Sequence, residues 1–164
     1  MSKQHILEAL QSAEVFQDMD EPFLDKLAEI GALVSFHNGD ILFKENAEAE
    51  SVYLIVDGDV DLFLCRPEVG CRSLMVVGPG DLVGWSPLVG RTRWSDSARA
   101  MTELTWVVAF PARELLHCCQ QDPASGLKLM SQIAEVLSDR LGATRSQLLG
   151  MTGHQLPEVA LESD

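Results

Sequence analysis

A β-hairpin is predicted by the run Ser51-Val52-Tyr53-Leu54-Ile55-Val56-Asp57-Gly58-Asp59-Val60-Asp61-Leu62-Phe63-Leu64. Its first half is almost entirely apolar, which is typical of a strand covered on both faces. Asp-Gly is a strong signal for a two-residue hairpin turn. Apolar and acidic residues then alternate, so the expected inner face is Val60, Leu62 and Leu64, and the expected solvent face is Asp59 and Asp61.

Further short strands are expected on both sides of this hairpin. They cover residues 33–37, 41–43, 73–77, 96–102 and 104–110, with turns at 38–40 and 78–81 and a loop at 66–70. Six or more short strands spaced about 8–12 residues apart indicate an antiparallel sandwich or barrel.

Helical periodicity appears only before and after the strands. Residues 4–16 and 21–30 have apolar residues at helical spacing, with Pro22 in the first turn of the second helix and Gly31 at its end. Helices over 112–121 and 123–150 follow the last strand. The predicted fold is therefore mainly β, an antiparallel jelly-roll-like roll with N-terminal helices and a long C-terminal helix. Residues 1–150 are expected to form one domain, and residues 151–164 a disordered tail.

The composition is that of a folded, acidic protein. The chain has 164 residues, 46% of them hydrophobic and 23% charged, and a formal net charge of −13. Such a charge repels a phosphate backbone, so direct nucleic-acid binding is not expected. Residues 51–120 carry six basic and eight acidic side chains, a net of −2. A site for a small anion is therefore expected in this segment.

Membrane insertion and secretion are not expected. The sequence has no apolar run of about 18 residues, and Glu8 and Glu14 interrupt the region where a signal peptide would be apolar. The four cysteines, Cys65, Cys71, Cys118 and Cys119, have no zinc-site spacing. We expect a cytoplasmic protein with reduced thiols.

Several short motifs occur in a characteristic order. They are Gly39–Phe43, Val52–Val60, Gly80–Gly84, and a cassette that runs from Gly84-Trp85-Ser86-Pro87-Leu88 to Ser97-Ala98-Arg99-Ala100. In this order they resemble the cyclic-nucleotide-binding domain of the catabolite-activator type, over about residues 5–150. No DNA-binding pattern follows residue 150, so the chain looks like a divergent, stand-alone member of that family.

The resemblance implies a ligand site. In the family, a short helix after the cassette glycine presents backbone N–H groups to a cyclic phosphate. A Glu after that glycine accepts a hydrogen bond from the ribose, an Arg about ten residues later pairs with the phosphate, and the C-terminal helix covers the base and forms the dimer.

This sequence departs from the family pattern at both polar positions. Trp85 stands where the Glu is expected, and the Arg position falls at Trp94 or Ser95, with Arg93 one residue away. A charge-assisted hydrogen bond contributes roughly 1.5–3 kcal/mol. Losing two would weaken cyclic AMP or cyclic GMP binding by roughly a hundredfold to ten-thousandfold. The candidate ligands are therefore these nucleotides, bound weakly, or another small anion.

The candidate ligand-binding residues are Val83, Gly84, Trp85, Ser86, Pro87, Leu88, Arg93, Trp94 and Ser95. Two interpretations of the tryptophans stay open: they pack into the roll, or they stack on an apolar ligand. Arg91, Arg93 and Arg99 are either solvated strand-end residues or part of an anion site. That site would combine Arg93 with Ser86, Ser95 and nearby backbone N–H groups.

Two other groups of residues favour structural roles. His5, His37, His117 and His154 are scattered, with no spacing typical of a metal site. Cys118 and Cys119 fit core packing in the helix 112–121.

The C-terminal helix is expected to form a homodimer. Its apolar stripe is Met130, Ile133, Leu137, Leu141 and Leu148. The narrow spacing is typical of paired helices, and a helix of about 25 residues is roughly 40 Å long and outreaches a small domain. The alternative is that the stripe packs on the roll.

Three functional hypotheses follow. The first is a non-enzymatic regulatory module that senses a small ligand and repositions its C-terminal helix toward an unknown effector protein. The second is a scaffolding protein whose pocket is filled by its own tryptophans. The third is a cupin-like enzyme, which the absence of metal-ligand spacing or of a catalytic set disfavours.

Overall fold

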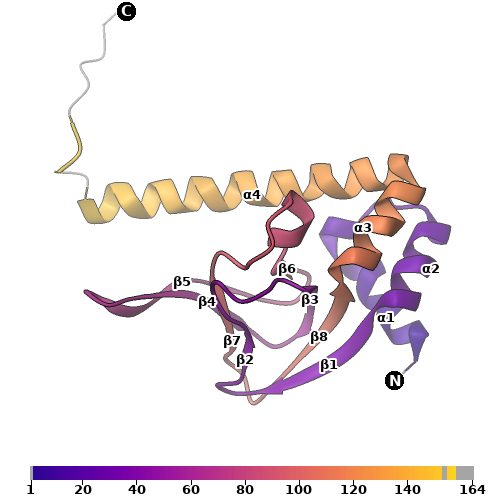
Figure 1. Ribbon diagram of the computed structural model, residues 1–164, viewed down its shortest axis with the longest axis horizontal. Helices are drawn as coiled ribbons and strands as arrows, with labels where there is room; N and C mark the ends of the chain where they lie inside the picture. Colours follow the sequence, from indigo (N-terminus) through magenta and orange to yellow (C-terminus); the bar gives the residue numbers. More distant parts are fainter. Residues whose placement is uncertain (1, 153–154, 158–164) are drawn as a thin grey trace, which may run out of the picture. The chain divides into compact units, whose positions relative to one another are not determined.

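The described residues form two antiparallel four-stranded sheets flanked by helices (Figure 1). The structure is a computed structural model that describes residues 2–152 and 155–157. The strands are β1 (Ala32–His37), β2 (Ile41–Phe43), β3 (Ser51–Asp57), β4 (Val60–Arg66), β5 (Gly70–Val77), β6 (Leu82–Val83), β7 (Ser97–Ala100) and β8 (Leu104–Pro111). The helices are α1 (Lys3–Ser12), η1 (Glu14–Phe16), α2 (Glu21–Ile30), η2 (Ser86–Val89), α3 (Ala112–Gln121) and α4 (Pro123–Thr152).

The sheets have the strand orders β1-β8-β3-β6 and β2-β7-β4-β5. The predicted fold class, an antiparallel β-roll with N-terminal helices and a long C-terminal helix, is therefore confirmed. The chain divides into two compact units, Met1–Leu129, which holds both sheets, and Met130–Asp164, which holds most of α4. The predicted tail at 151–164 lies mostly outside the described residues, although α4 includes residues 151 and 152.

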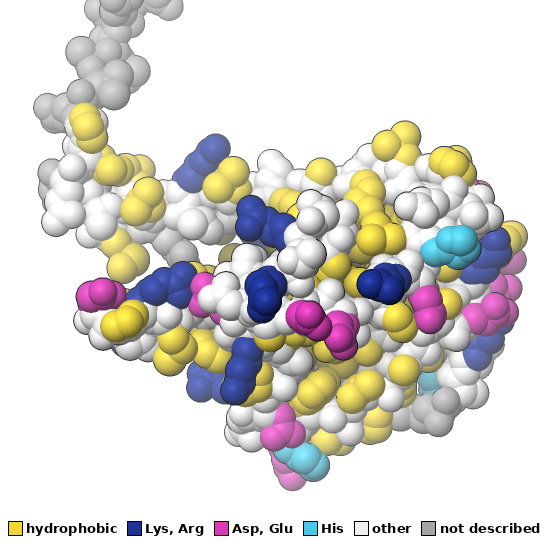
Figure 2. All heavy atoms as spheres, viewed as in Figure 1, with side chains coloured by type: hydrophobic (Ala, Val, Ile, Leu, Met, Phe, Trp, Pro, Cys, Tyr) yellow, Lys and Arg dark blue, Asp and Glu magenta, His cyan; other side chains and the backbone are white. Residues whose placement is uncertain are grey.

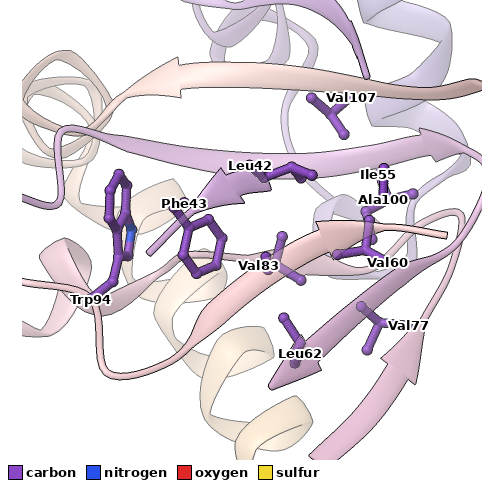
Figure 3. Packing of buried hydrophobic residues seen from close by; sticks show 11 residues of the cluster. Leu42, Phe43, Ile55, Val60, Leu62, Val77, Val83, Trp94, Ala100 and Val107 are labelled. Carbon is purple, nitrogen blue, oxygen red and sulfur yellow. The ribbon is translucent and has the colours of Figure 1, made fainter. Parts of the chain in front are cut away.

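The core of the first unit lies between the two sheets, inside the roll. It is built from Leu42, Phe43, Ile55, Val60, Leu62, Val77, Val83, Trp94, Ala98, Ala100 and Val107 (Figure 3). Most of these residues come from strands, but Trp94 comes from the loop between η2 and β7. A residue of the candidate site is thus part of the core.

The first predicted helix is interrupted. α1 ends at Ser12, Ala13 is extended, and a short 3-10 turn, η1, follows. The interruption turns the chain so that both Val15 and Phe16 are buried, and the ring of Phe16 lies 6.3 Å from that of Phe110. Tertiary packing therefore overrides the helical periodicity of residues 4–16, whereas α2 begins and ends as predicted.

The predicted hairpin of residues 51–64 is wrong, because the turn at Asp57-Gly58 carries the chain from one sheet to the other: β3 pairs with β6 and β8, whereas β4 pairs with β5 and β7. The alternation in β4 is as predicted, but one prediction about exposure is wrong. Asp61 lies on the side opposite Val60 and Leu62, yet it is only 2% exposed. Arg99 stands directly opposite in β7 and donates to Asp61 Oδ2 at 2.9 Å. Ser73 donates to the other carboxylate oxygen. The Asp61 carboxylate is covered by its cross-strand partners, which the alternation pattern does not reveal.

The expectation of four reduced cysteines is also wrong. Cys65 and Cys71 form a disulfide between β4 and β5. The two residues are direct partners in the ladder, and β5 begins at Gly70, three residues before the predicted strand. Cys118 and Cys119 are free and buried, and burial raises the pKa of both thiols.

The start of α4 is fixed by a side-chain cap and a close contact with α3. The Asp122 carboxylate accepts hydrogen bonds from the backbone N–H and the hydroxyl of Ser125. A Cβ atom on Gly126 would lie 2.6 Å from the backbone oxygen of Cys119, so only glycine fits there. None of the described helices is long and apolar enough to cross a membrane.

Candidate functional site

The cassette begins where β6 ends, and Gly84 is its first residue. Gly84 has φ +70°, a conformation that favours glycine. A Cβ atom here would lie 3.1–3.3 Å from the side chains of Phe43, Trp94 and Tyr53. The glycine therefore lets three aromatic side chains approach the backbone closely.

Trp94 packs into the roll, so the first of the two interpretations of this residue is correct. Its indole N–H donates to the carbonyl oxygen of Gly84 at 3.3 Å. Its ring stacks on Phe43, with centroids 4.8 Å apart, and Phe43 stacks in turn on Tyr53 at 5.8 Å (Figure 3). Burial raises the pKa of the Tyr53 hydroxyl. The cassette rests on three stacked rings.

Trp85 differs from Trp94 because it is only half-buried. It directly precedes the four-residue turn η2, and its carbonyl oxygen accepts a hydrogen bond from the N–H of Leu88 at 2.9 Å. The side chains of Pro87 and Leu88 are buried and anchor the turn. Val83 is buried in β6. Val83, Pro87 and Leu88 therefore pack inside the protein, as Trp94 does, whereas Trp85 stays partly exposed.

The two candidate serines face each other. The hydroxyl oxygens of Ser86 and Ser95 lie 3.5 Å apart, and Ser86 is buried while Ser95 is exposed. Either hydroxyl can donate to the other. This pair joins two residues nine positions apart, one in η2 and one in the segment that precedes β7.

Arg93 is directed differently from its neighbour Trp94. Its guanidinium donates to the backbone oxygen of Asn46, and its backbone forms an isolated bridge with Glu48. It lines an open groove of about 660 Å³ together with Glu48, Glu50, Arg91, Arg113 and Glu114. Figure 2 shows basic and acidic side chains next to one another on the visible face. The groove offers an anion three guanidinium groups but also three carboxylates, so its charge does not favour an anion.

Arg99, near the end of the cassette, is not among the residues that line the groove. Its guanidinium pairs with Asp61 and lies 5.2 Å from the centre of the Phe63 ring. Its function is to neutralise a buried carboxylate on the outer face of the sheet.

The described residues contain no group of three His, Cys, Asp or Glu side chains placed to hold a metal ion. His154 lies outside the described residues. Close to Gly84 the polar groups are the hydroxyls of Ser86 and Ser95 and the indole N–H of Trp94, and the carboxylates of Glu48, Glu50 and Glu114 line the outer groove.

The predicted dimer residues Met130, Ile133, Leu137, Leu141 and Leu148 all lie on α4. Leu141 and Leu148 each expose about half of their surface. Sequence reasoning did not identify Phe43 and Tyr53 as neighbours of the cassette. Both occur in the quoted motifs, but nothing in their spacing indicates that they stack beside Trp94.

Comparison with known proteins identifies the family. The profile of the cyclic nucleotide-binding domain matches residues 33–122, and the chain belongs to this family. A solved putative cyclic nucleotide-binding protein from Geobacter metallireducens is 29% identical, with a TM-score of 0.72, over 82% of this chain and 96% of that one. A cyclic nucleotide-binding domain from Methylobacillus flagellatus has a TM-score of 0.78 at 20% identity, over 96% of this chain and 86% of that one.

Two curated relatives are much longer. The CRP-like cAMP-activated global transcriptional regulator of Mycobacterium tuberculosis is 25% identical over 150 residues, which cover 92% of this chain and 65% of the regulator. The neuropathy target esterase sws of Drosophila virilis is 31% identical over 139 residues, which cover 80% of this chain but 9% of the esterase. The common element is a regulatory domain, and the esterase shares no more than this part of its length with the chain.

Proposed function

We propose that this chain is a non-enzymatic regulatory module whose cassette does not hold cyclic AMP or cyclic GMP at ordinary affinity. The observation that carries the proposal is the buried Trp94 side chain, stacked on Phe43 and bonded to Gly84. The position at which the family pattern has the phosphate-binding Arg falls at Trp94 or at the neighbouring Ser95. An indole offers one N–H donor and no charge, and that donor is already engaged.

The Glu position of the family pattern, directly after the cassette glycine, supports the same conclusion. Trp85 replaces the Glu that accepts from the ribose, and an indole nitrogen cannot accept a hydrogen bond. Arg93, the nearest guanidinium in the sequence, is bonded to Asn46 at the edge of the outer groove. The ligand of the module is therefore a small molecule that needs neither the family's Glu carboxylate nor its Arg guanidinium, or the module acts without a ligand.

The output of the module is its long helix. A homodimer through Met130, Ile133, Leu137, Leu141 and Leu148 in a cytoplasmic protein would present paired helices to an effector protein. A net charge of −13 favours a protein effector over nucleic acid. A ligand can reposition the helix only by the difference between its affinities for the two positions.

The second candidate function is a ligand-free scaffold. The same observation favours it, because Trp94 fills the inside of the cassette with the protein's own side chain. The two candidates differ in whether any small molecule stabilises the protein. An enzyme remains the least supported hypothesis.

A thermal-shift and calorimetric titration with cyclic AMP and cyclic GMP tests the proposal. A ligand at about a hundred times its dissociation constant adds about 2.7 kcal/mol, a shift of roughly 5–10 °C. We expect no shift at 1 mM nucleotide for the native chain. The double variant Trp85→Glu/Trp94→Arg restores the family pattern and should gain binding. Trp106→Phe in β8, away from the cassette, is the matched control and should gain no binding. A rise in the melting temperature of the native chain with either nucleotide would overturn the proposal.

The dimer is tested by light scattering after chromatography. Ile133 of the predicted stripe is buried within the chain, so the substitution is made at an exposed position: Leu141→Asp places a charge there and should produce a monomer. Ala143→Asp places the same charge on the opposite side of α4, since two residues correspond to about 200° of helical rotation, and should leave the dimer intact. A monomeric native chain, or two dimeric variants, would show that the stripe is not the interface.

A further inference from the structure

We propose that Cys65 and Cys71 form a thiol–disulfide exchange site, and that its oxidation state reaches the cassette through Arg66 and Glu45. The site lies in the first unit, on the hairpin of β4 and β5, and is independent of the ligand proposal. Its reactants are thiols of the glutathione type or a dithiol oxidoreductase. The inference rests on the pairing and exposure of the two cysteines and on the contacts of their neighbours.

The hairpin holds the two sulfur atoms together in either oxidation state. Cys65 and Cys71 are direct partners in the β4–β5 ladder, with Cα atoms 3.9 Å apart. A loop of three residues connects the strands and is closed by a hydrogen bond from Val69 N–H to the Arg66 carbonyl. Because the ladder pairs them directly, the two thiols stay adjacent after reduction and can form the bond again.

The pair is accessible to a reactant, unlike the other two cysteines. Cys65 and Cys71 are both exposed, whereas Cys118 and Cys119 are buried in α3. In the exchange, a thiolate of the reductant attacks one sulfur atom, the Cys65–Cys71 bond breaks, and the released thiolate takes up a proton. A second thiol resolves the mixed disulfide, so the protein gains two electrons and the reductant becomes a disulfide. Exposure of the sulfur atoms is what this step requires.

An ion pair connects the hairpin end to the next loop. The guanidinium of Arg66, next to Cys65, donates two hydrogen bonds of 2.9 Å to the carboxylate of Glu45 and one of 2.7 Å to the carbonyl oxygen of Cys65. The Glu45 side chain is 18% exposed, and its pKa is lowered by these bonds. A hairpin end held by the disulfide therefore holds Arg66 against Glu45.

The loop that contains Glu45 is bonded to the cassette. Glu45 N–H donates to the Ser97 hydroxyl at 2.9 Å, and Asn46 N–H donates to the Trp94 carbonyl at 3.0 Å. Trp94 N–H donates in return to the Ala47 carbonyl at 3.2 Å. Contacts thus run without interruption from the disulfide through Arg66 and Glu45 to Trp94. Loosening the hairpin end by reduction should loosen the backbone that positions Trp94.

The first test is exchange in the native protein. The full chain is equilibrated with oxidised or reduced glutathione, its thiols are alkylated without denaturant, and the labelled cysteines are located by mass spectrometry. We expect Cys65 and Cys71 to be labelled only in the reduced sample, reversibly, and Cys118 and Cys119 in neither. Labelling of the pair in the oxidised sample, or a bond that only denaturation makes reducible, would overturn the proposal.

The second test is hydrogen exchange at residues 44–49 and 92–97 in both oxidation states. A partly exposed ion pair contributes about 0.2–1 kcal/mol, so reduction should speed exchange by roughly 1.5- to fivefold. Arg66→Gln should remove this response, and Cys65→Ser/Cys71→Ser should behave as the reduced protein. Arg72→Gln is the matched control, because the guanidinium of Arg72 donates to the carbonyl of the neighbouring Cys71 and forms no ion pair with the described residues. Equal exchange in both states, or a response that survives Arg66→Gln, would refute the coupling.

Discussion

The substitution Trp94→Ala tests the packing on which the proposed function depends. Trp94 is 8% exposed, stacks on Phe43 and donates to the Gly84 carbonyl. Truncating a buried aromatic side chain costs about 3–5 kcal/mol when the surroundings do not collapse. For a chain of this size that is a fall in melting temperature of roughly 6–20 °C.

A second substitution separates the contribution of ring packing from that of the hydrogen bond. Trp94→Phe keeps a ring on Phe43 but loses the hydrogen bond to Gly84, which contributes about 0.5–1.5 kcal/mol. We therefore expect it to lose about 1–2 kcal/mol. Urea unfolding followed by circular dichroism gives both values from the shift in midpoint at constant slope.

Rescue by a small molecule is the sharpest part of this prediction. An apolar cavity left by truncation binds a matching aromatic molecule, so indole should raise the melting temperature of Trp94→Ala and leave the native chain unchanged. A loss below about 1 kcal/mol for Trp94→Ala would refute the packing described here, since 3 kcal/mol is the lower limit for such a buried ring.

Three further predictions concern neighbouring features. Arg99→Leu should cost about 1–3 kcal/mol in urea unfolding, because it leaves the buried Asp61 carboxylate without its cation, although Arg99 is 45% exposed. The double variant Asp61→Leu/Arg99→Leu should recover most of that loss, and a double variant as unstable as the single one would contradict the pairing. Hydrogen bonds from Ser125 lower the pKa of the Asp122 carboxyl group. The ionised carboxylate therefore stabilises the folded protein fully above its ordinary pKa, and this stabilisation is lost as the pH falls through the lowered pKa. Asp122→Asn should therefore melt below the native chain at about pH 6 and approach it at about pH 3; a difference independent of pH would refute the charge effect. Gly84→Ala should cost about 1–3 kcal/mol in the same assay, more than Gly39→Ala, because both glycines have positive φ but only Gly84 has aromatic neighbours; equal losses would mean that the rings do not constrain it.

Local patterns predicted most of the secondary structure. The turn at Asp57-Gly58 and the alternation after it are encoded within a few neighbouring residues, so they could be predicted without knowledge of the fold. The pairing across that turn could not, since β3 and β4 lie in different sheets. The order of helices and strands and the motifs from Gly39 to Ala100 indicated the family that the comparisons then identified. β6 was not predicted because a strand of two residues leaves no periodic signal.

The candidate site was less predictable. The sequence placed the departures from the family pattern at Trp85 and, by counting residues from the cassette glycine, at Trp94 or Ser95. Counting did not tell whether Trp94 enters the roll, because a slip of one residue in register sends a side chain to the other face. Hydrogen bonds to residues 46 and 47, almost fifty positions earlier, fix that register.

The sequence by itself determined most of the strands and helices, because hydrophobic period and turn chemistry act over a few positions along the chain. Tertiary structure decided which side chains are covered and paired. Asp61 is buried because Arg99 and Ser73 lie opposite it, and Cys65 is bonded because the ladder brings Cys71 to it. Trp94 fills the cassette because Gly84, Phe43 and Tyr53 meet around it. Each of these contacts joins separate strands or loops, and only the register of the folded sheets brings them together.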